Sequence, residues 1–236
     1  STPKSEKRRI KEALIDGNTD LVIGTHAIIQ NDVEFHKLGL VITDEQHRFG
    51  VDQRANLAMK GNEPNTLVMS ATPIPRTLAL MIYGDLDISV LDELPPGRQT
   101  VRTDVVDSRY HKRIYAFIKK QIEAGNRAYI VCLLVEESES ENMISAEKYA
   151  EELANGAFRG INIGLLHGKM KPAQKENVMQ AFADGDIKLL VATTVIEVGV
   201  DVPEATVMVV ENAERFGLSQ LHQLRGRVGR GKEQAY

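Results

Sequence analysis

The chain has 236 residues, with 29 Lys and Arg against 33 Asp and Glu and a formal net charge of -4. That balance excludes a histone-like or polycationic nucleic-acid binder, whose domain would be basic overall, but it leaves room for local basic sites. The single cysteine, Cys132, excludes an internal disulfide framework and favours a reducing compartment. No apolar run approaches the roughly 18 residues of a membrane-spanning helix, so we expect a cytoplasmic protein with no membrane partner.

The first part of the chain carries three short apolar runs that predict strands, over residues 20–23, 40–43 and 66–69. The best candidate for a domain boundary follows at Pro95 and Pro96, because paired prolines block both a helix and a central strand. We therefore expect a domain over 1–95, a linker over 96–108 and a second domain over 109–236.

The second part alternates predicted helices and strands. A helix is predicted over 110–124, where Gly125 follows the last apolar position, and another from Pro172 to about Gly185, with Phe182 facing inward. Strands are predicted over residues 128–135, 161–166, 187–192 and 206–210. Strands that alternate with helices are typical of an α/β fold, in which helices cover both faces of a parallel sheet.

Two adjacent carboxylates, Asp44 and Glu45, follow the strand predicted over 40–43. Reaction centres of open α/β sheets lie at the carboxyl ends of the strands. One carboxylate there can hold Mg²⁺, and its neighbour can polarise the water that attacks a γ-phosphate. Acidic pairs after strands are common, so the pair alone does not establish catalysis, but the tetrad that continues through Gln46 and His47 is far more specific.

A hydroxyl-bearing tripeptide, Ser70-Ala71-Thr72, follows the strand predicted over 66–69. Its simplest interpretation is a capped helix start, in which a hydroxyl accepts a hydrogen bond from a free backbone N–H group. However, if Ser70 or Thr72 lies beside His47, a hydrogen bond from its hydroxyl to the imidazole of His47 would link the site of the paired carboxylates to a second site.

Two arginines three residues apart, Arg227 and Arg230, lie in the segment that begins at Gln223. On a helix they would share one face, and their guanidinium groups would fit the oxygens of a transferring phosphoryl group. The alternative is a basic surface helix that grips nucleic acid or has no ligand. Gly226 and Gly229 favour the phosphate site, because glycines weaken a helix and are better explained by a close backbone approach.

Thr193 opens a segment, residues 193–203, that follows the strand predicted over 187–192. Threonine hydroxyls and loop N–H groups suit contacts with a sugar-phosphate backbone, which position a nucleic-acid strand without reading its sequence. An ordinary connection between a strand and a turn is the alternative.

In their order and spacing these segments resemble the motor of superfamily 2 helicases, and specifically the RecG family of branched-DNA helicases. The segments that carry the resemblance are residues 23–26, 44–51, 70–77, 193–203, 216–222 and 223–230. Residues 48–51 and 72–77 are also similar to the transcription-repair coupling translocases. Those relatives usually have Glu in place of Gln46, whereas residues 84–87 and 92–97 are more similar to RecG.

The resemblance implies two RecA-like lobes with parallel sheets, the first incomplete and the second nearly complete, that close on ATP and open on its hydrolysis. Asp44 would hold Mg²⁺, and Glu45 would orient the attacking water. Gly199 and Asp201 would approach the nucleotide from the second lobe. The residues that would contact its phosphates are Gln223, Arg227 and Arg230.

The resemblance also implies residues for DNA contact and for coupling. Thr25, His26 and Thr193 would touch the DNA backbone. The residues that would couple the nucleotide state to lobe movement are His47, Ser70 and Thr72. The implied function is an ATP-dependent helicase that remodels branched or duplex DNA in repair and recombination, in the bacterial cytoplasm at the nucleoid. Two alternatives stay open, a double-strand DNA translocase and a non-catalytic module that binds DNA or a partner.

The sequence contains no P-loop, the Gly-x4-Gly-Lys-Ser/Thr motif whose backbone cradles phosphates. The run from Gly226 to Lys232 has the spacing, but Glu233 replaces the hydroxyl and the run lies inside the arginine segment. We therefore expect a piece of a longer motor that binds ATP weakly and does not unwind DNA by itself. We expect the intact protein to be monomeric, and this piece to dimerise through an exposed sheet edge of its first lobe.

Overall fold

The computed structural model describes residues 2–45, 57, 59–70, 87–132, 139–193 and 201–236, and for residues 139–145 it describes the backbone alone. The chain divides into two compact units, Ser1–Pro73 and Ile74–Tyr236. The domain limits expected around the proline pair remain a prediction.

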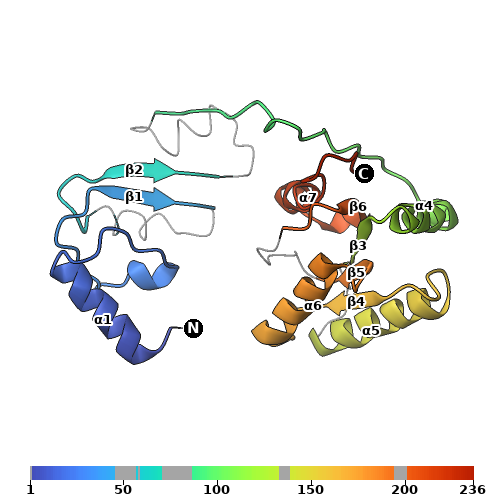
Figure 1. Cartoon of the computed structure of the whole chain (residues 1–236), viewed down its shortest axis with the longest axis horizontal. Coiled ribbons are helices and arrows are strands. Elements are labelled where there is room, and N and C mark those ends of the chain that lie inside the picture. Colours follow the sequence, from blue (N-terminus) through green and yellow to red (C-terminus); the bar gives the residue numbers. More distant parts are fainter. Residues whose placement is uncertain (1, 46–56, 58, 71–86, 133–138, 194–200) are drawn as a thin grey trace. The chain divides into compact units, whose positions relative to one another are not determined.

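The first unit is built around a pair of parallel strands (Figure 1). Its described elements are the helix α1 (Lys4–Ile15), the 3₁₀ helix η1 (His26–Ile28), β1 (Leu40–Thr43) and β2 (Asn65–Val68). Both strands lie within one residue of their predicted ranges. Along β1 the side chains alternate, with Val41 and Thr43 buried while Leu40 and Ile42 are each 55% exposed. One face of this small sheet therefore packs against the interior of the unit, and the other face is open.

The prediction of a strand over residues 20–23 was wrong. These residues form an irregular connection, and Leu21 and Ile23 are 74% and 88% exposed. A strand is held by the backbone hydrogen bonds of a neighbouring strand, and in the described part of this unit β1 and β2 pair only with each other. The apolar run thus has the composition of a strand without a partner that would complete its ladder.

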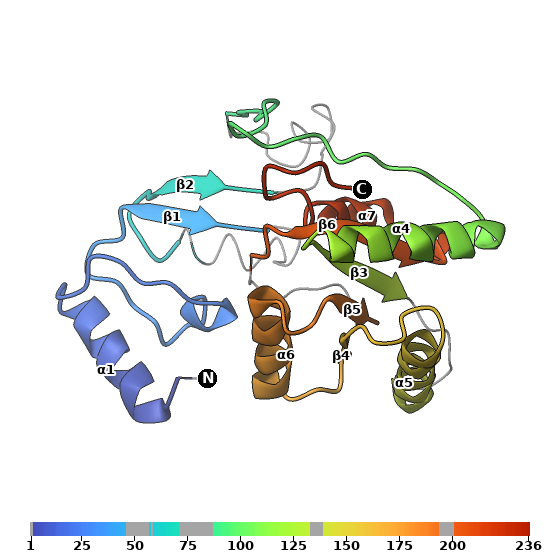
Figure 2. The same ribbon diagram turned by 45° about the vertical axis from the view of Figure 1, so that its right-hand side comes forward.

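The second unit is a four-stranded parallel sheet with helices on both faces (Figure 1 and Figure 2). The strand order is β4-β5-β3-β6, and every neighbouring pair is parallel. Its elements in chain order are η3 (Ser108–Tyr110), α4 (His111–Glu123), β3 (Arg127–Cys132), α5 (Glu139–Asn155), β4 (Ile163–Leu166), α6 (Pro172–Asp184), β5 (Leu189–Ala192), β6 (Ala205–Glu211), η4 (Ala213–Arg215) and α7 (Leu218–Arg225). The four strands predicted in this part are confirmed with small shifts at their ends, and residues 133–135 of the first lie outside the described residues.

Two hydrophobic layers, one on each face of this sheet, follow from the alternation of side chains along its strands. On β3, Tyr129 packs with Phe182 of α6 and Leu224 of α7. The next residue, Ile130, points to the opposite face and packs with Ile118 of α4. Every residue of β3 and β5 is buried. The sheet is therefore the middle one of three layers, as the continuous apolar runs predicted.

The two predicted helices of this unit are confirmed at both ends. α4 is followed two residues later by Gly125, and α6 begins at Pro172 and is followed by Gly185. Both glycines have a left-handed backbone, with φ of 95° and 86°. Phe182 faces inward and is fully buried.

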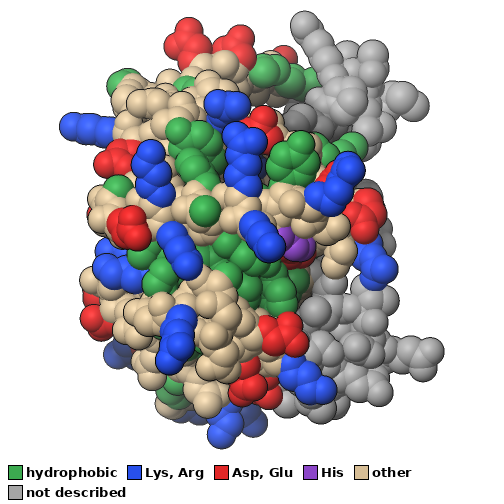
Figure 3. All heavy atoms as spheres, turned by 90° about the vertical axis from the view of Figure 1, so that its right-hand side faces the viewer, with side chains coloured by type: hydrophobic (Ala, Val, Ile, Leu, Met, Phe, Trp, Pro, Cys, Tyr) green, Lys and Arg blue, Asp and Glu red, His purple; other side chains and the backbone are tan. Residues whose placement is uncertain are grey.

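Charged side chains of both signs cover the face of the molecule drawn in Figure 3, where Lys and Arg are interspersed with Asp and Glu. This mixture agrees with the near balance of charges in the sequence. A phosphate-bearing ligand on such a surface needs a particular site rather than a broad field of one sign. Within the described ranges, no helix combines the length and the apolar character needed to cross a membrane.

Candidate functional site

The paired acids of the first unit lie immediately beyond the carboxyl end of β1. The backbone N–H of Glu45 donates to Oδ1 of Asp44 over 2.8 Å, and Glu45 has a φ of 48°. A left-handed backbone is uncommon for a residue with a side chain, so the chain turns sharply where the two carboxylates leave the sheet. Asp44 is exposed and Glu45 is half-buried, which leaves the Asp44 carboxylate accessible to a cation.

Ser70 lies at the same edge of this sheet. The hydrogen-bond ladder continues one residue beyond β2, where the N–H of Met69 donates to the carbonyl of Thr43 over 2.8 Å. Because the strands are parallel, the residues after Thr43 and after Met69 leave the sheet at the same end. The structure thus brings Asp44, Glu45 and Ser70 to one sheet edge. Two further residues predicted to act there, His47 and Thr72, lie outside the described residues, as does Gln46 of the same tetrad.

Thr25 and His26 lie at the start of η1 in the same unit. Thr25 precedes the 3₁₀ helix with an extended backbone, and His26 is its first residue. Both side chains are exposed. Their contact with a nucleic-acid backbone stays a prediction.

The arginine segment of the second unit is not one continuous helix. α7 ends at Arg225, and the backbone of Gly229 is left-handed with a φ of 70°. Arg227 and Arg230 therefore lie in the turns that follow the helix, and helical periodicity does not place them on one face. Gln223 lies within α7 and is partly buried.

Arg230 has two acceptors within the unit. Its Nη1 donates to Oδ1 of Asp201 over 3.2 Å, and its Nε donates to the carbonyl of Gly226 over 3.2 Å. The side chains of Arg230 and Asp201 are 32% and 57% exposed, so this ion pair stays open to a competing ligand and contributes little to stability. The structure joins two residues that were expected to approach the same nucleotide.

The charges of Arg227 and Arg230 both act on the hydroxyl of Tyr129 on β3. Burial raises the pKa of its hydroxyl to about 12, while the positive charges of Arg227 and Arg230 act in the opposite direction. Asp201 also acts on this hydroxyl and adds to the upward shift of its pKa. Arg227 therefore belongs to the same group of charges as the Asp201–Arg230 pair.

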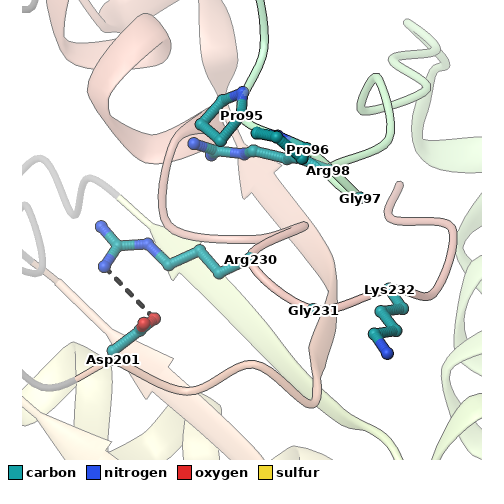
Figure 4. Close-up of a pocket in the computed structure, with 8 residues that line it drawn as sticks. All are labelled: Pro95, Pro96, Gly97, Arg98, Asp201, Arg230, Gly231 and Lys232. Carbon is teal, nitrogen blue, oxygen red and sulfur yellow. Dashed lines mark hydrogen bonds and ion pairs between the residues drawn. The ribbon is translucent and has the colours of Figure 1, made fainter.

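An open pocket of about 570 Å³ lies beside this ion pair (Figure 4). It is lined by Pro95, Pro96, Gly97, Arg98, Asp201, Arg230, Gly231 and Lys232. Pockets of roughly 300–1,000 Å³ are typical of small-molecule and cofactor sites. The pocket lies entirely within the second unit and has the size of a nucleotide site.

Two glycines allow the backbone near this pocket to pack closely. A Cβ on Gly231 would lie 2.6 Å from the carbonyl oxygen of Pro203, and a Cβ on Gly229 would lie 3.0 Å from Cγ2 of Val101. At Gly226 the nearest atom to an added Cβ would be 3.3 Å away. The close approach inferred from the sequence therefore occurs at Gly229 and is weaker at Gly226.

Thr193 directly follows the carboxyl end of β5. Its N–H donates to the carbonyl of Leu166 over 3.1 Å, which extends the pairing of β4 with β5 by one residue. The residue is partly buried. Gly199, the remaining residue expected near the nucleotide, lies outside the described residues.

Sequence reasoning missed two groups of residues in this unit. It used the Pro95-Pro96-Gly97 turn only as a boundary, although Arg98 at its end lines the pocket. The signal available in the sequence was a cation placed directly after a turn with fixed geometry.

The second group is a polar cluster at the end of β6. Nε2 of His111 lies 3.3 Å from Oε2 of Glu211, and the hydroxyl of Tyr149 donates to Oε1 of Glu211 over 3.3 Å. The cluster ties α4 and α5 to the last residue of the strand. In the part of the chain that the structure describes, no three His, Cys, Asp or Glu residues are grouped as metal ligands.

Comparison with known proteins covers both halves of the chain. The family model described as DEAD/DEAH box helicase matches residues 1–81. The model described as helicase conserved C-terminal domain matches residues 111–232. The second match contains the whole sheet of the second unit and the arginine segment.

Curated relatives match all or nearly all of the chain. The ATP-dependent DNA helicase RecG of Thermotoga maritima is 55% identical over 236 residues, which is 100% of this chain and 30% of the relative. The protein of the same name from Escherichia coli is 53% identical over 234 residues, which is 94% of this chain and 32% of the relative. The chain thus spans about 30% of the length of the relatives it matches.

Solved structures of helicases are also similar to the chain. A structure of RecG bound to a three-way DNA junction has a TM-score of 0.73 and 51% identity, and the match covers 100% of this chain and 30% of that one. The helicase Lhr of Mycobacterium smegmatis, bound to ssDNA and AMP-PNP, matches 100% of this chain and 33% of that one with a TM-score of 0.60 and 19% identity, which supports the fold alone. The α/β fold of RecA-like lobes is confirmed, and the chain belongs to the RecG family of superfamily 2 helicases.

Proposed function

We propose that this chain forms part of the motor of an ATP-dependent DNA helicase, which remodels branched DNA in repair and recombination. The proposal depends mainly on the 51% identity and whole-chain likeness to RecG bound to a three-way junction. The contact between Asp201 and Arg230 supports it, because both residues were expected at the nucleotide. We place the protein in the bacterial cytoplasm, acting at the nucleoid.

The acid pair of the first unit would serve the hydrolysis of ATP. Mg²⁺ is usually held by one or two carboxylates together with water and phosphate oxygens, and the exposed carboxylate of Asp44 suits that arrangement. When bound, the cation would neutralise part of the negative charge on the phosphates of ATP. Glu45 would orient the attacking water, and the residues that would transmit the nucleotide state are His47, Ser70 and Thr72.

The second unit would bind the phosphates. Arg230 would exchange its exposed contact with Asp201 for phosphate oxygens, which a guanidinium group binds in a fork-like geometry. The other residues assigned to the nucleotide are Gly199, Gln223 and Arg227. The residues assigned to the DNA backbone are Thr25, His26 and Thr193.

The test is a chimaera in which all 236 residues of this chain replace the matching segment of the Thermotoga maritima relative. We expect the chimaera to unwind a three-way junction with ATP. Glu45→Gln should lower ATP hydrolysis by about 10²–10⁴-fold, and Arg230→Gln by about 10³-fold or more. The control is Arg109→Gln, because Arg109 is exposed and pairs locally with Asp107. A chimaera that moves along duplex DNA but leaves the junction intact would indicate the translocase instead.

By itself, the chain should bind ATP weakly, since its sequence has no P-loop to cradle the phosphates. Titration with a fluorescent ATP analogue measures this directly. Micromolar affinity would contradict the expectation.

We also propose that the isolated chain dimerises through its first unit. Leu40 and Ile42 of β1 are each 55% exposed, and Leu67 of β2, which pairs with Ile42, is 49% exposed. Burial of these side chains by a second copy would be favourable. Sedimentation velocity over a range of concentrations tests this, and a monomer at every concentration would argue against it.

A further inference from the structure

A rigid turn carries Arg98 to the edge of the pocket. The N–H of Arg98 donates to the carbonyl of Pro95 over 3.1 Å, and Gly97 has a φ of 83°. Proline at the second position and a left-handed glycine at the third are the features of a type II turn. Since proline fixes its own φ, this turn has few alternatives. The direction in which Arg98 leaves the turn is therefore determined by the backbone.

The segment after this turn is fastened to the end of the same unit. Nε2 of Gln99 donates to the carbonyl of Lys232 over 2.9 Å, and Nε2 of Gln234 donates to the carbonyl of Thr100 over 2.9 Å. The N–H of Arg102 donates to the carbonyl of Ala235 over 2.9 Å. These bonds join residues 99–102 to residues 232–235, which directly follow the arginine segment. The positions of Arg98 and Arg230 are thus fixed relative to each other inside one unit.

The pocket between them carries excess positive charge. Among the described residues that line it, Arg98, Arg230 and Lys232 are cationic and Asp201 carries the one carboxylate. Asp201 is already paired with Arg230. The half-buried side chain of Arg98 makes no ion pair or side-chain hydrogen bond to any residue that the structure describes. In Figure 4 the guanidinium groups of Arg98 and Arg230 extend to the same side, whereas the Lys232 side chain points away from them.

We propose that Arg98 is a further phosphate-binding residue, which acts together with Arg230 on one nucleoside triphosphate. This inference rests on the proposed function, because it takes Arg230 as a nucleotide contact. Two guanidinium groups on one side of a pocket can each bind a different phosphate group of the same ligand. An open pocket of about 570 Å³ has room for a small polyanion, whereas the backbone contacts of a DNA strand are spread along a surface.

The experiment measures the affinity of the 236-residue chain for two anions, ATP and inorganic tripolyphosphate. Binding is followed by two-dimensional NMR of the backbone amides, which detects weak complexes and also reports whether each variant keeps its fold. The variants are Arg98→Gln, Arg98→Lys, Arg230→Gln and the control Arg102→Gln. Arg102 lies in the same segment, is 68% exposed, pairs with Asp104 and does not line the pocket.

Arg98→Gln should weaken the binding of both anions by about fivefold to tenfold, the loss expected for one partly exposed charge-assisted contact. Arg98→Lys should recover part of that loss, because it restores the charge without the fork. Arg230→Gln should weaken binding at least as much, and Arg102→Gln should leave it within twofold of the original.

Each other outcome overturns the inference in a recognisable way. If only Arg230→Gln weakens binding, Arg98 is not a phosphate contact, and the proposed function stands. If neither variant changes the affinity, or the chain binds neither anion, the nucleotide site assigned to Arg230 fails as well. If Arg98→Gln leaves both anions unaffected but weakens the binding of a DNA duplex, Arg98 belongs to a DNA interface.

Discussion

Replacing Gly229 with alanine tests how tightly the arginine segment packs against the segment that follows the turn. Gly229 has a φ of 70°, and an added Cβ would lie 3.0 Å from Cγ2 of Val101 and 3.1 Å from Cβ of Ala235. These two neighbours are themselves held in place, because the N–H of Arg102 donates to the carbonyl of Ala235 over 2.9 Å. The substitution should therefore strain the backbone and also push apart two packed segments.

The two effects can be separated with a second glycine of the same unit. A left-handed backbone costs alanine about 1 kcal/mol relative to glycine, and overpacking adds about 1–3 kcal/mol where neighbours are constrained. We expect Gly229→Ala to lower the free energy of unfolding by about 2–3 kcal/mol. Gly125→Ala is the control, since Gly125 has a φ of 95° but no atom within 4 Å of an added Cβ. It should lose about 1 kcal/mol.

The composition of the chain gives a selective assay. There is no Trp, and all six tyrosines lie within Ile74–Tyr236. Tyrosine fluorescence during urea denaturation therefore follows the unfolding of the second unit alone. The difference between the two variants measures the steric contribution at Gly229. Equal losses for Gly229→Ala and Gly125→Ala would refute the close approach of Val101 and Ala235.

Three other substitutions test the site and its surroundings. Burial raises the pKa of the Cys132 thiol from 9.0 to about 11, so its contribution to stability is complete below pH 9.0 and is lost as the pH rises toward 11. Unfolding measured on both sides of pH 9.0 should show a loss of roughly 2 kcal/mol that is absent from Cys132→Ala, and the same pH dependence in both proteins would contradict this. Asp201→Asn should change the free energy of unfolding by less than about 1 kcal/mol, because its pair with Arg230 is exposed. The same change should strengthen tripolyphosphate binding, measured by NMR titration, since it removes a competing negative charge, and weaker binding would count against the pocket. Tyr149→Phe removes the 3.3 Å hydrogen bonds to Glu211 and to the hydroxyl of Tyr115 and should cost about 0.5–1.5 kcal/mol in thermal or urea denaturation, so an unchanged stability would mean that these bonds contribute nothing.

Much of the second unit was predictable because its two central strands, β3 and β5, are buried on both faces. Burial on both faces makes each strand a continuous apolar run, and β5, all of whose residues are buried, is such a run. The run over residues 20–23 has a similar composition, but there Leu21 and Ile23 stay exposed. Composition reports only that a segment is suited to a sheet. Whether a strand forms depends on a neighbour that composition alone does not reveal.

The candidate site was predictable in its residue types and less so in its geometry. Asp201 and Arg230 were assigned to the same ligand from their separate motifs, and the structure places them 3.2 Å apart. The helical spacing assumed for Arg227 and Arg230 does not apply, because α7 ends at Arg225. The sequence marks Arg98 as a cation after a fixed turn, but its place beside Arg230 could not be predicted, since it depends on hydrogen bonds between segments more than 100 residues apart.

These long-range bonds also bear on how such a motor would change shape. Residues 99–102 are joined to residues 232–235 by three hydrogen bonds, each worth roughly 0.5–1.5 kcal/mol. A hinge that opens and closes two lobes concentrates its rotation in a few residues, and rotation within 99–102 would break these bonds together. Residues 99–102 are therefore poorly suited to carry such a rotation. A triphosphate held by both Arg98 and Arg230 would strengthen the same attachment, so nucleotide binding would hold residues 98–102 more firmly against residues 230–235.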